Sequence, residues 1–169
     1  MNEASENKST IELAEFSGIV WRIMFADQSE KTCEPVRSPI GRFHHDNQTA
    51  LYTSCTKEGA SLAIKRYLKA GDPDRIIVPL QVNASRIYDI RKTDFAKCAS
   101  IVWQDNIDNG ESAPTWQYSD AAGVSGAQGM LYASRSKPDL THLVLFDVSD
   151  GIVAPAGNAE AWCPKTALQ

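Results

Sequence analysis

Hydrophobic and polar positions along the chain follow the period of strands at several places. Residues 17–25 (SGIVWRIMF) form an apolar, β-rich run that a single arginine interrupts. Further strands are predicted over residues 49–55, 75–82, 85–90, 130–133 and 142–147. The run at 75–82 is almost continuously apolar, which is typical of a strand in the middle of a sheet.

One segment follows the period of a helix instead. Five apolar residues recur at i, i+3, i+4, i+7 and i+8, namely Ala60, Ala63, Ile64, Tyr67 and Leu68. Thr56 is a suitable N-cap, and Gly71 followed by Pro73 is a suitable end. The pattern predicts an amphipathic helix that buries its apolar stripe.

The remaining segments carry weaker patterns. Short helices are predicted over residues 11–16 and 93–99, and a loop over 27–41. Residues 103–129 are irregular and rich in Asn, Gly, Ser and Asp, and a connection this long is often functional or contains an unrecognised helix. We expect residues 1–10 to be a flexible N-terminus and 11–169 to form a single domain. Several short strands with few helices favour the α+β class.

Composition and charge narrow the possible functions. The 169 residues are 43% hydrophobic and 22% charged, as in one ordinary globular domain. A net charge of −4 argues against a protein that mainly coats nucleic acid or an anionic membrane, although it leaves room for a local basic pocket. No apolar run reaches the length of a membrane span, and the polar N-terminus lacks the features of a secretory signal. We therefore expect a cytoplasmic protein.

Cysteine and histidine spacing offers no metal site. The four cysteines lie far apart, without a CxxC pair, at Cys33, Cys55, Cys98 and Cys163. This favours reduced thiols over a zinc site or a disulfide scaffold. His44 and His45 are adjacent and would point to opposite sides of an extended segment, while His142 is remote in sequence. Surface or hydrogen-bonded roles are expected for His44 and His45.

Two arginines beside apolar strand positions are the most informative polar residues. Common enzyme signatures are absent: there is no P-loop, GxGxxG, HExxH or GxSxG motif. Arg22 shares the face of Val20 and Met24 by alternation, and Arg42 lies in a turn-like Gly-Arg-Phe segment. Two planar guanidiniums suit a diphosphate, which they bind bidentately. Spacing alone favours the alternative, two structural salt bridges.

The order of several short motifs resembles the RES-domain family, toxins of bacterial toxin–antitoxin pairs. The motifs are Trp21-Arg22, Gly41-Arg42-Phe43, LYTS at 51–54 with a helix after it, GMLYASR at 129–135, and LVLF at 143–146. The resemblance implies an ADP-ribosyltransferase-like fold and NAD as substrate, with no metal. It also implies cleavage of the nicotinamide–ribose bond, with transfer of ADP-ribose to water, phosphate or a protein. The implied partner is an antitoxin with a helix-turn-helix domain of the Xre type, in a hetero-oligomeric complex.

The resemblance also implies site residues. Arg22 and Arg42 match the family's two arginines, Tyr52 its strand tyrosine and Ser134 its late serine. The arginines would hold the pyrophosphate, Tyr52 would stack on nicotinamide, and Ser134 would hydrogen-bond the nicotinamide or its ribose. Taken alone, Tyr52 would equally suit a core aromatic and Ser134 a turn residue.

One position departs from the family pattern. The aligned position of the family glutamate holds Lys65, which cannot stabilise a cationic ribose centre but would add positive charge near the phosphates. Glu58 lies about two helical turns earlier on a similar face and is a possible substitute. His44, after the Gly-Arg-Phe turn, is another candidate polar participant.

These observations lead to one function and two alternatives. The first is an NAD-consuming toxin that acts as a glycohydrolase or phosphorylase. One alternative is an ADP-ribosyltransferase that modifies a cellular protein. The other, supported by Lys65, is a catalytically weakened module that retains the fold and the antitoxin interface.

Overall fold

The computed structural model describes residues 10–164, with helices and strands in a mixed α+β order. The strands are β1 (Leu13–Phe25), β2 (Leu51–Ser54), β3 (Arg75–Asp89), β4 (Gly129–Ala133), β5 (Thr141–Leu145), β6 (Val153–Pro155) and β7 (Glu160–Trp162). The α-helices are α1 (Lys57–Ile64), α2 (Gln104–Asp108) and α3 (Trp116–Val124). Short 3-10 helices lie at Ala26–Lys31, Lys65–Tyr67, Ile90–Lys92 and Cys98–Ser100.

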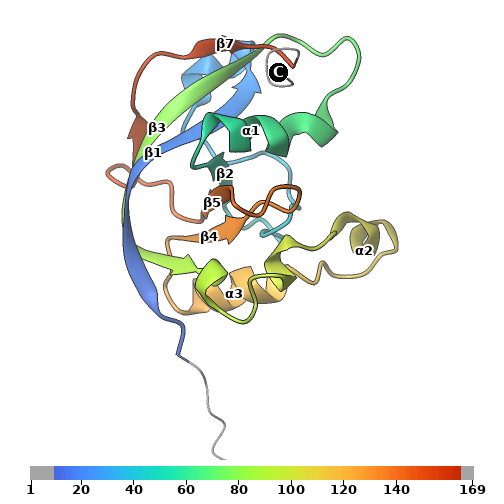
Figure 1. Ribbon diagram of the computed structural model, residues 1–169, viewed down its shortest axis with the longest axis vertical. Coiled ribbons are helices and arrows are strands. Elements are labelled where there is room, and N and C mark those ends of the chain that lie inside the picture. Colours follow the sequence, from blue (N-terminus) through green and yellow to red (C-terminus); the bar gives the residue numbers. More distant parts are fainter. Residues whose placement is uncertain (1–9, 165–169) are drawn as a thin grey trace, which may run out of the picture.

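The sheet closes on itself. Its strands follow the order β1-β2-β5-β4-β3, and β3 pairs back with β1 along almost their whole length. Among the strand pairs of residues 10–164, only β3–β4 is parallel. In Figure 1 the long, curved β1 and β3 run side by side, and the short β2, β5 and β4 lie between α1 and α3. Closure leaves β6 and β7 as short additions on β3.

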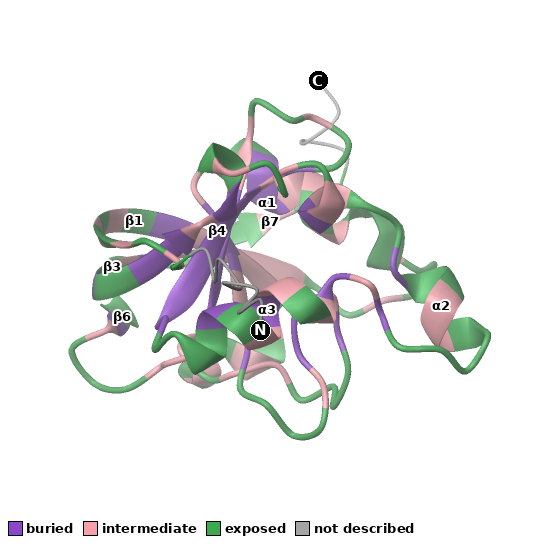
Figure 2. Ribbon diagram, turned by 90° about the horizontal axis from the view of Figure 1, so that it is seen from below, coloured by how far each residue is buried: buried purple, intermediate pink, exposed green. Residues whose placement is uncertain are grey.

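Two hydrophobic clusters lie on opposite faces of the short strands, because successive side chains alternate between the faces. The inner cluster includes Leu51, Leu143 and Leu145 with apolar residues of β1 and β3. The outer cluster includes Met130 and Val144 with residues of α3 and of the segment before it. Figure 2 shows the buried positions concentrated in these central strands, while α2 projects from the body of the molecule. The side chains next to the outer cluster line the candidate site.

The first strand is longer than the sequence pattern predicts. The helix expected over residues 11–16 is wrong, because β1 begins at Leu13 and pairs with Tyr88 of β3. The two strands expected at 75–82 and 85–90 are one strand of 15 residues. Long-range pairing between β1 and β3 causes both differences. A short stretch of sequence contains no information about such pairing. The flexible N-terminus predicted at 1–10 lies outside the described residues, except for Thr10.

The helix after β2 begins as predicted and ends early. The Thr56 side chain accepts a hydrogen bond from the Gly59 amide, which confirms the N-cap. The helix changes to a 3-10 turn at residues 65–67 instead of continuing to Gly71. Its apolar stripe is only partly buried: Ala60 is in the core, whereas Tyr67 is exposed. Most of the stripe forms one wall of a cavity, which is lined by Ala60, Ala63, Ile64 and Tyr67.

The second half contains helices where no regular structure is expected. Residues 103–129 include α2 and α3, whereas the helix expected around 93–99 is a series of turns that ends in the 3-10 helix at Cys98–Ser100. The helix α3 has one signal in the sequence, which is the helical spacing of Tyr118, Ala121 and Ala122. All four cysteines are free thiols in the structure.

Candidate functional site

A cavity of about 490 Å³ opens beside the short strands, a size typical of small-molecule sites. Its walls come from β1, the segment at 36–44, β2, α1 with the turn after it, Trp103 and Gln104, and the ends of β4 and β5. Five of the six predicted site residues line it, namely Arg22, Arg42, His44, Tyr52 and Ser134. The fold therefore brings together residues that lie more than a hundred positions apart.

Arg22 is held by backbone carbonyls rather than by a carboxylate. Its Nη1 donates to the carbonyl oxygens of Thr32 and Glu34 at 2.8 Å, and to that of Lys31 at 3.3 Å. Burial lowers the pKa of Arg22, and the nearby Cys33 and Glu34 oppose that shift. No acidic side chain within the described part of the chain forms an ion pair with it. The expected structural salt bridge is therefore wrong for Arg22.

Arg42, which also lines the cavity, has a similar arrangement. Its Nη1 donates to the carbonyl oxygens of Ile101 at 3.0 Å and Ala99 at 3.3 Å, and no described carboxylate pairs with it. Burial lowers its pKa, and the positive charges of Arg66 and Arg135 contribute to the shift. Arg42 is thus a half-buried cation among other cations.

The helix that the sequence did not reveal holds the Arg42 turn in place. Trp116 Nε1, at the start of α3, donates to the Gly41 carbonyl at 2.8 Å. The Thr115 hydroxyl donates to the carbonyl of Arg42 itself. His45 stacks on the Trp116 ring, with centroids 4.3 Å apart. The segment at 103–129 therefore positions the guanidinium that faces the cavity.

Tyr52 and His44 form a closed hydrogen-bond chain beside Arg42. His44 Nε2–H donates to the Ser38 carbonyl at 2.8 Å, so Nδ1 accepts from the Tyr52 hydroxyl at 2.8 Å. The same hydroxyl accepts from the Phe43 amide at 2.9 Å. Burial strongly raises the pKa of Tyr52, so its phenol stays protonated. The polar atoms of both side chains are occupied within the protein, while the Tyr52 ring lines the cavity.

Glycine is required at position 41 for this chain to form. A Cβ on Gly41 would lie 2.3 Å from His44 Cε1 and 2.9 Å from the Tyr52 hydroxyl. Contacts this short do not occur between real atoms, so any side chain here would separate His44 from Tyr52. The Gly-Arg-Phe motif is thus a packing requirement next to a functional arginine.

Ser134 and Lys65 lie in contrasting environments. Ser134 is buried at the cavity wall, and its hydroxyl has one long contact, 3.5 Å to Ser136. Lys65 is exposed on the turn after α1 and is not among the residues that line the cavity. Glu58 is also away from the cavity and pairs with Lys137 at 2.6 Å. The helix therefore brings neither its lysine nor its carboxylate to this site, and the role expected of Lys65 stays a prediction.

Four functional candidates were missed in the sequence. Ser54 and His142 are register partners on β2 and β5, and Ser54 Oγ lies 2.7 Å from His142 Nδ1 at the cavity wall. Burial and then the charge of Arg42 lower the pKa of His142 to about 4. Arg66 and Arg135 also line the cavity. Strand pairing creates the first two neighbours, so no local motif could have indicated them.

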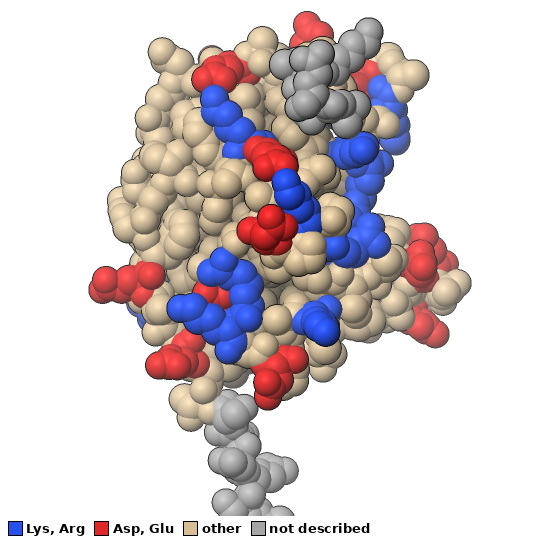
Figure 3. Space-filling model, viewed as in Figure 1, with Lys and Arg blue, Asp and Glu red and all other residues tan. Residues whose placement is uncertain are grey.

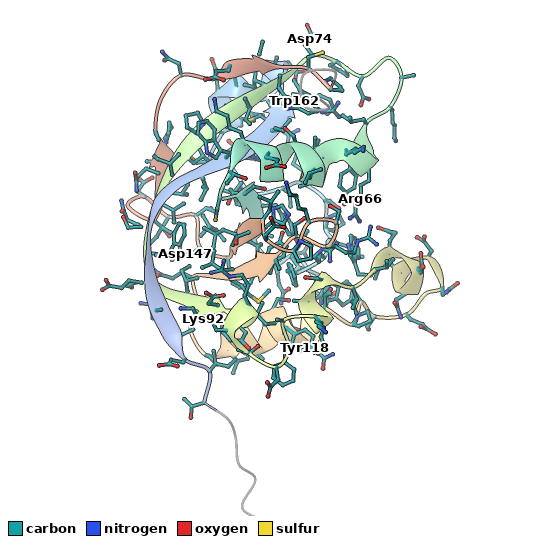
Figure 4. All side chains as sticks on the ribbon, viewed as in Figure 1. Arg66, Asp74, Lys92, Tyr118, Asp147 and Trp162 are labelled. Atoms are coloured by element: carbon teal, nitrogen blue, oxygen red, sulfur yellow. The ribbon has the colours of Figure 1, made fainter. Side chains whose placement is uncertain are left out.

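The charged side chains that line the cavity are all positive. Four arginines line it, and none of its lining residues is Asp or Glu. Figure 4 shows Arg66 beyond the C-terminal end of α1, toward the segment that carries α2. On the face in Figure 3, basic side chains gather around this end of α1. A cavity that is lined by several guanidiniums and by no acidic side chain is suited to an anionic ligand.

Comparison with known proteins identifies the family. The family model of the RES domain matches residues 19–162, which is most of the chain and includes the cavity walls. This chain belongs to the RES-domain family. Among curated proteins, no sequence matches it.

A solved structure shares the RES fold of this chain. It is a chain of the M. tuberculosis MbcT–MbcA toxin–antitoxin complex, with a TM-score of 0.66 and 16% identity. The match covers 92% of this chain and 90% of that chain. The α+β class and the fold expected from the motifs are thereby confirmed.

A second hollow of this RES domain, about 670 Å³, adjoins the first. The two share Arg22, Ile23, Arg66 and Tyr67 among their lining residues. Guanidiniums therefore lie where the hollows meet. Within residues 10–164, no helix is long and apolar enough to cross a membrane, and no cluster of side chains could hold a metal ion.

Proposed function

We propose that this RES domain binds NAD and cleaves its nicotinamide–ribose bond, as the toxin of a toxin–antitoxin pair. One observation carries the proposal: Arg22 and Arg42 are half-buried, have no acidic partner among the described residues, and line one cavity without acids. A buried cation without a counter-ion is costly for the free protein, and a ligand with two phosphate charges removes that cost.

The guanidiniums are arranged to receive a pyrophosphate. Backbone carbonyls hold Nη1 of each arginine, which fixes the orientation of the planar group. The remaining N–H groups of Arg22 and Arg42 have no partner among the described residues and can donate to phosphate oxygens. A dinucleotide has two nucleoside halves joined by pyrophosphate, which matches two adjoining hollows that share Arg22 and Arg66.

In this arrangement the nicotinamide half occupies the first cavity. The Tyr52 ring offers a stacking surface, and the Ser134 hydroxyl is available for the carboxamide or the ribose. When the bond to C1′ breaks, its electron pair passes to the pyridinium nitrogen and nicotinamide leaves as a neutral molecule. The arginines contribute by fixing the dinucleotide, so catalysis depends mainly on orientation.

The lack of a carboxylate favours a second candidate function. A cationic ribose centre is normally stabilised by a nearby anion, and no Asp or Glu lines this cavity. A module that binds the dinucleotide and an antitoxin but turns NAD over slowly fits this feature. Binding of NAD without release of nicotinamide would distinguish this module from the toxin enzyme.

The direct test is nicotinamide release from NAD by the purified protein. We expect release in the wild type and its loss in the double variant Arg22→Ala/Arg42→Ala. Arg86→Ala is the matched control, because Arg86 also donates to a backbone carbonyl but lies outside both hollows. Absence of release by the wild type, with unchanged NAD concentration in cells that express it, would contradict the proposed activity.

The toxin part of the proposal predicts a partner. The matching fold comes from a toxin–antitoxin complex, and this chain carries a mild net charge of −4 that suits association with a basic DNA-binding protein. We expect a neighbouring reading frame that encodes a helix-turn-helix protein and neutralises this chain on coexpression. Harmless overexpression without such a neighbour would contradict the toxin role, whether or not NAD is cleaved in vitro.

A further inference from the structure

The Ser54–His142 pair has one nitrogen left for a ligand. Both residues are buried and line the cavity, and Ser54 Oγ lies 2.7 Å from His142 Nδ1. His142 Nε2 has no hydrogen-bond partner among the described residues. Every solvent-inaccessible side-chain nitrogen or oxygen in that part of the chain does have a partner. Nε2 is therefore accessible, and its accessible side is the cavity.

The other titratable groups of the cavity are unsuited to accept a proton. Its four arginines remain cationic. His44 uses both ring nitrogens, and the Tyr52 hydroxyl is already bonded on both sides. Burial strongly raises the pKa of Tyr132, so its phenol keeps its proton. With no Asp or Glu in the lining, His142 Nε2 is the nitrogen base that remains in the first cavity.

Resting on the proposed function, we propose that His142 is a catalytic residue that accepts the proton of the attacking water, and that Ser54 positions it. The role requires the tautomer in which Nδ1–H donates to Ser54 Oγ across the 2.7 Å contact, because only then does the lone pair of Nε2 face the cavity. The C1′–nitrogen bond of NAD breaks and its electrons pass to nicotinamide. The water oxygen then bonds to C1′, and the released proton passes to Nε2 and on to solvent. The proposal names water as the acceptor of ADP-ribose.

The surroundings of His142 favour this role. The charged or titratable groups that face it are Arg42, whose positive charge acts on the ring, and Tyr132, its register partner on β4, with centroids 5.3 Å apart. Burial and Arg42 keep the imidazole neutral near pH 7. A weak base is sufficient in a reaction where the leaving group departs first, because the water gives up its proton late.

Two substitutions remove the base, and each keeps a hydrogen-bonding group near one of the two ring nitrogens. His142→Asn keeps an amide near Nδ1 that can still bond Ser54, and His142→Gln places a non-basic amide near Nε2. We expect each to lower kcat for nicotinamide release in phosphate-free buffer by about 100-fold, with an unchanged Kd for NAD. Arg86→Ala is again the matched control, because Arg86 lies outside both hollows.

Ser54→Ala tests positioning without removing the base. We expect a loss in kcat of about tenfold, with Kd for NAD and the melting temperature unchanged. ADP-ribose added to the wild type should shift the ¹⁵N resonance of His142 Nε2 more than that of Nδ1. This readout needs no turnover and remains informative if a His142 variant folds poorly.

The outcomes distinguish this inference from the proposed function. If the wild type releases no nicotinamide, the proposed function fails, and the catalytic role of His142 fails with it. If the wild type is active and folded His142→Asn and His142→Gln retain its kcat, only the role of His142 is overturned. An unchanged Nε2 resonance at saturating ADP-ribose overturns the contact as well.

Discussion

Two pairs of arginines in this molecule lie in opposite electrostatic surroundings. Arg91 donates from Nε and Nη2 to both carboxylate oxygens of Asp89, at 2.8 and 2.7 Å, and Arg75 pairs with Asp72 at 3.0 Å. Arg22 and Arg42, at the cavity, bond to backbone carbonyls and to no carboxylate of the described chain. The fold pairs Arg91 and Arg75 with carboxylates, and it leaves Arg22 and Arg42, which line the first cavity, without such a partner.

This difference separates stability from binding. The Arg91–Asp89 pair is complete in the free protein, and hydrogen bonds and charge from Arg91 lower the pKa of Asp89 against the opposing effect of burial. The cavity arginines leave donors and positive charge unused, which is the arrangement expected where a ligand supplies the anion. The following predictions test this distinction from the largest expected effect to the smallest.

Burial, and then the positive charge of Arg42, makes the fold sensitive to acid through His142. Burial and then Arg42 lower the folded-state pKa of His142 from 6.5 to about 4. Between these values the unfolded chain binds a proton and the folded chain does not, so stability falls as pH drops from 6.5 to 4. The loss is on the order of 3 kcal/mol. Chemical denaturation at pH 7 and pH 5 should show a smaller pH effect in His142→Gln than in the wild type.

His45 gives the control with the opposite sign. Although burial opposes the shift, hydrogen bonds to Asp120 and Asp46 raise the pKa of His45 above 6.5. Its contribution is fully present below pH 6.5 and is lost as pH rises through the raised value. His45→Gln should therefore retain the acid sensitivity and increase it, because the variant lacks this stabilisation at low pH. An equal pH dependence in His142→Gln and wild type would show that His142 titrates alike in both states.

Arg42→Ala should weaken NAD binding by about 1.5–3 kcal/mol, the usual contribution of a charged hydrogen bond. Its melting temperature should change little, because the loss of two carbonyl contacts is offset by relief of repulsion from Arg66 and Arg135. Arg91→Ala should instead lower the melting temperature and leave NAD affinity unchanged, since it leaves the poorly exposed Asp89 without its partner. Titration calorimetry and thermal denaturation measure the two effects. If Arg42→Ala bound NAD normally but had a low melting temperature, Arg42 would stabilise the fold and not bind the ligand.

Tyr52→Phe separates the hydroxyl of Tyr52 from its ring. The substitution leaves the Phe43 amide and His44 Nδ1 without their partner, so we expect a loss of about 1–2 kcal/mol in unfolding free energy. NAD affinity should persist because a phenyl ring still stacks on nicotinamide. Urea denaturation and calorimetry on the same preparation give both values. If stability were unchanged and NAD affinity fell strongly, the Tyr52 hydroxyl would bond to NAD and not to the Phe43 amide and His44.

The smallest effect is expected at Lys65. Lys65→Glu should change unfolding free energy by less than about 0.5 kcal/mol and leave nicotinamide release as it is, because the side chain is exposed and outside the cavity. Arg66→Glu, one residue later and in the cavity wall, should reduce NAD affinity. A higher rate in Lys65→Glu would place this position at the reaction centre, as the family alignment suggests.

Much of the candidate site follows from the sequence. Arg22, Arg42, Tyr52, Ser134 and His44 were expected from short motifs in a fixed order, and all five line the cavity. The N-cap at Thr56 and the strands at β2, β4 and β5 also follow from local patterns. These features depend on residues close in sequence, where side-chain type and spacing determine the backbone.

The tertiary structure alone decided the rest. Pairing with β3 makes Leu13–Phe16 a strand, and pairing of β2 with β5 places Ser54 against His142. Only the fold shows that Arg22 and Arg42 bond to carbonyls instead of carboxylates, and that the helix bearing Lys65 turns this residue to solvent. These outcomes come from contacts between distant segments, whose energies exceed local preferences and leave no trace in a short window of sequence.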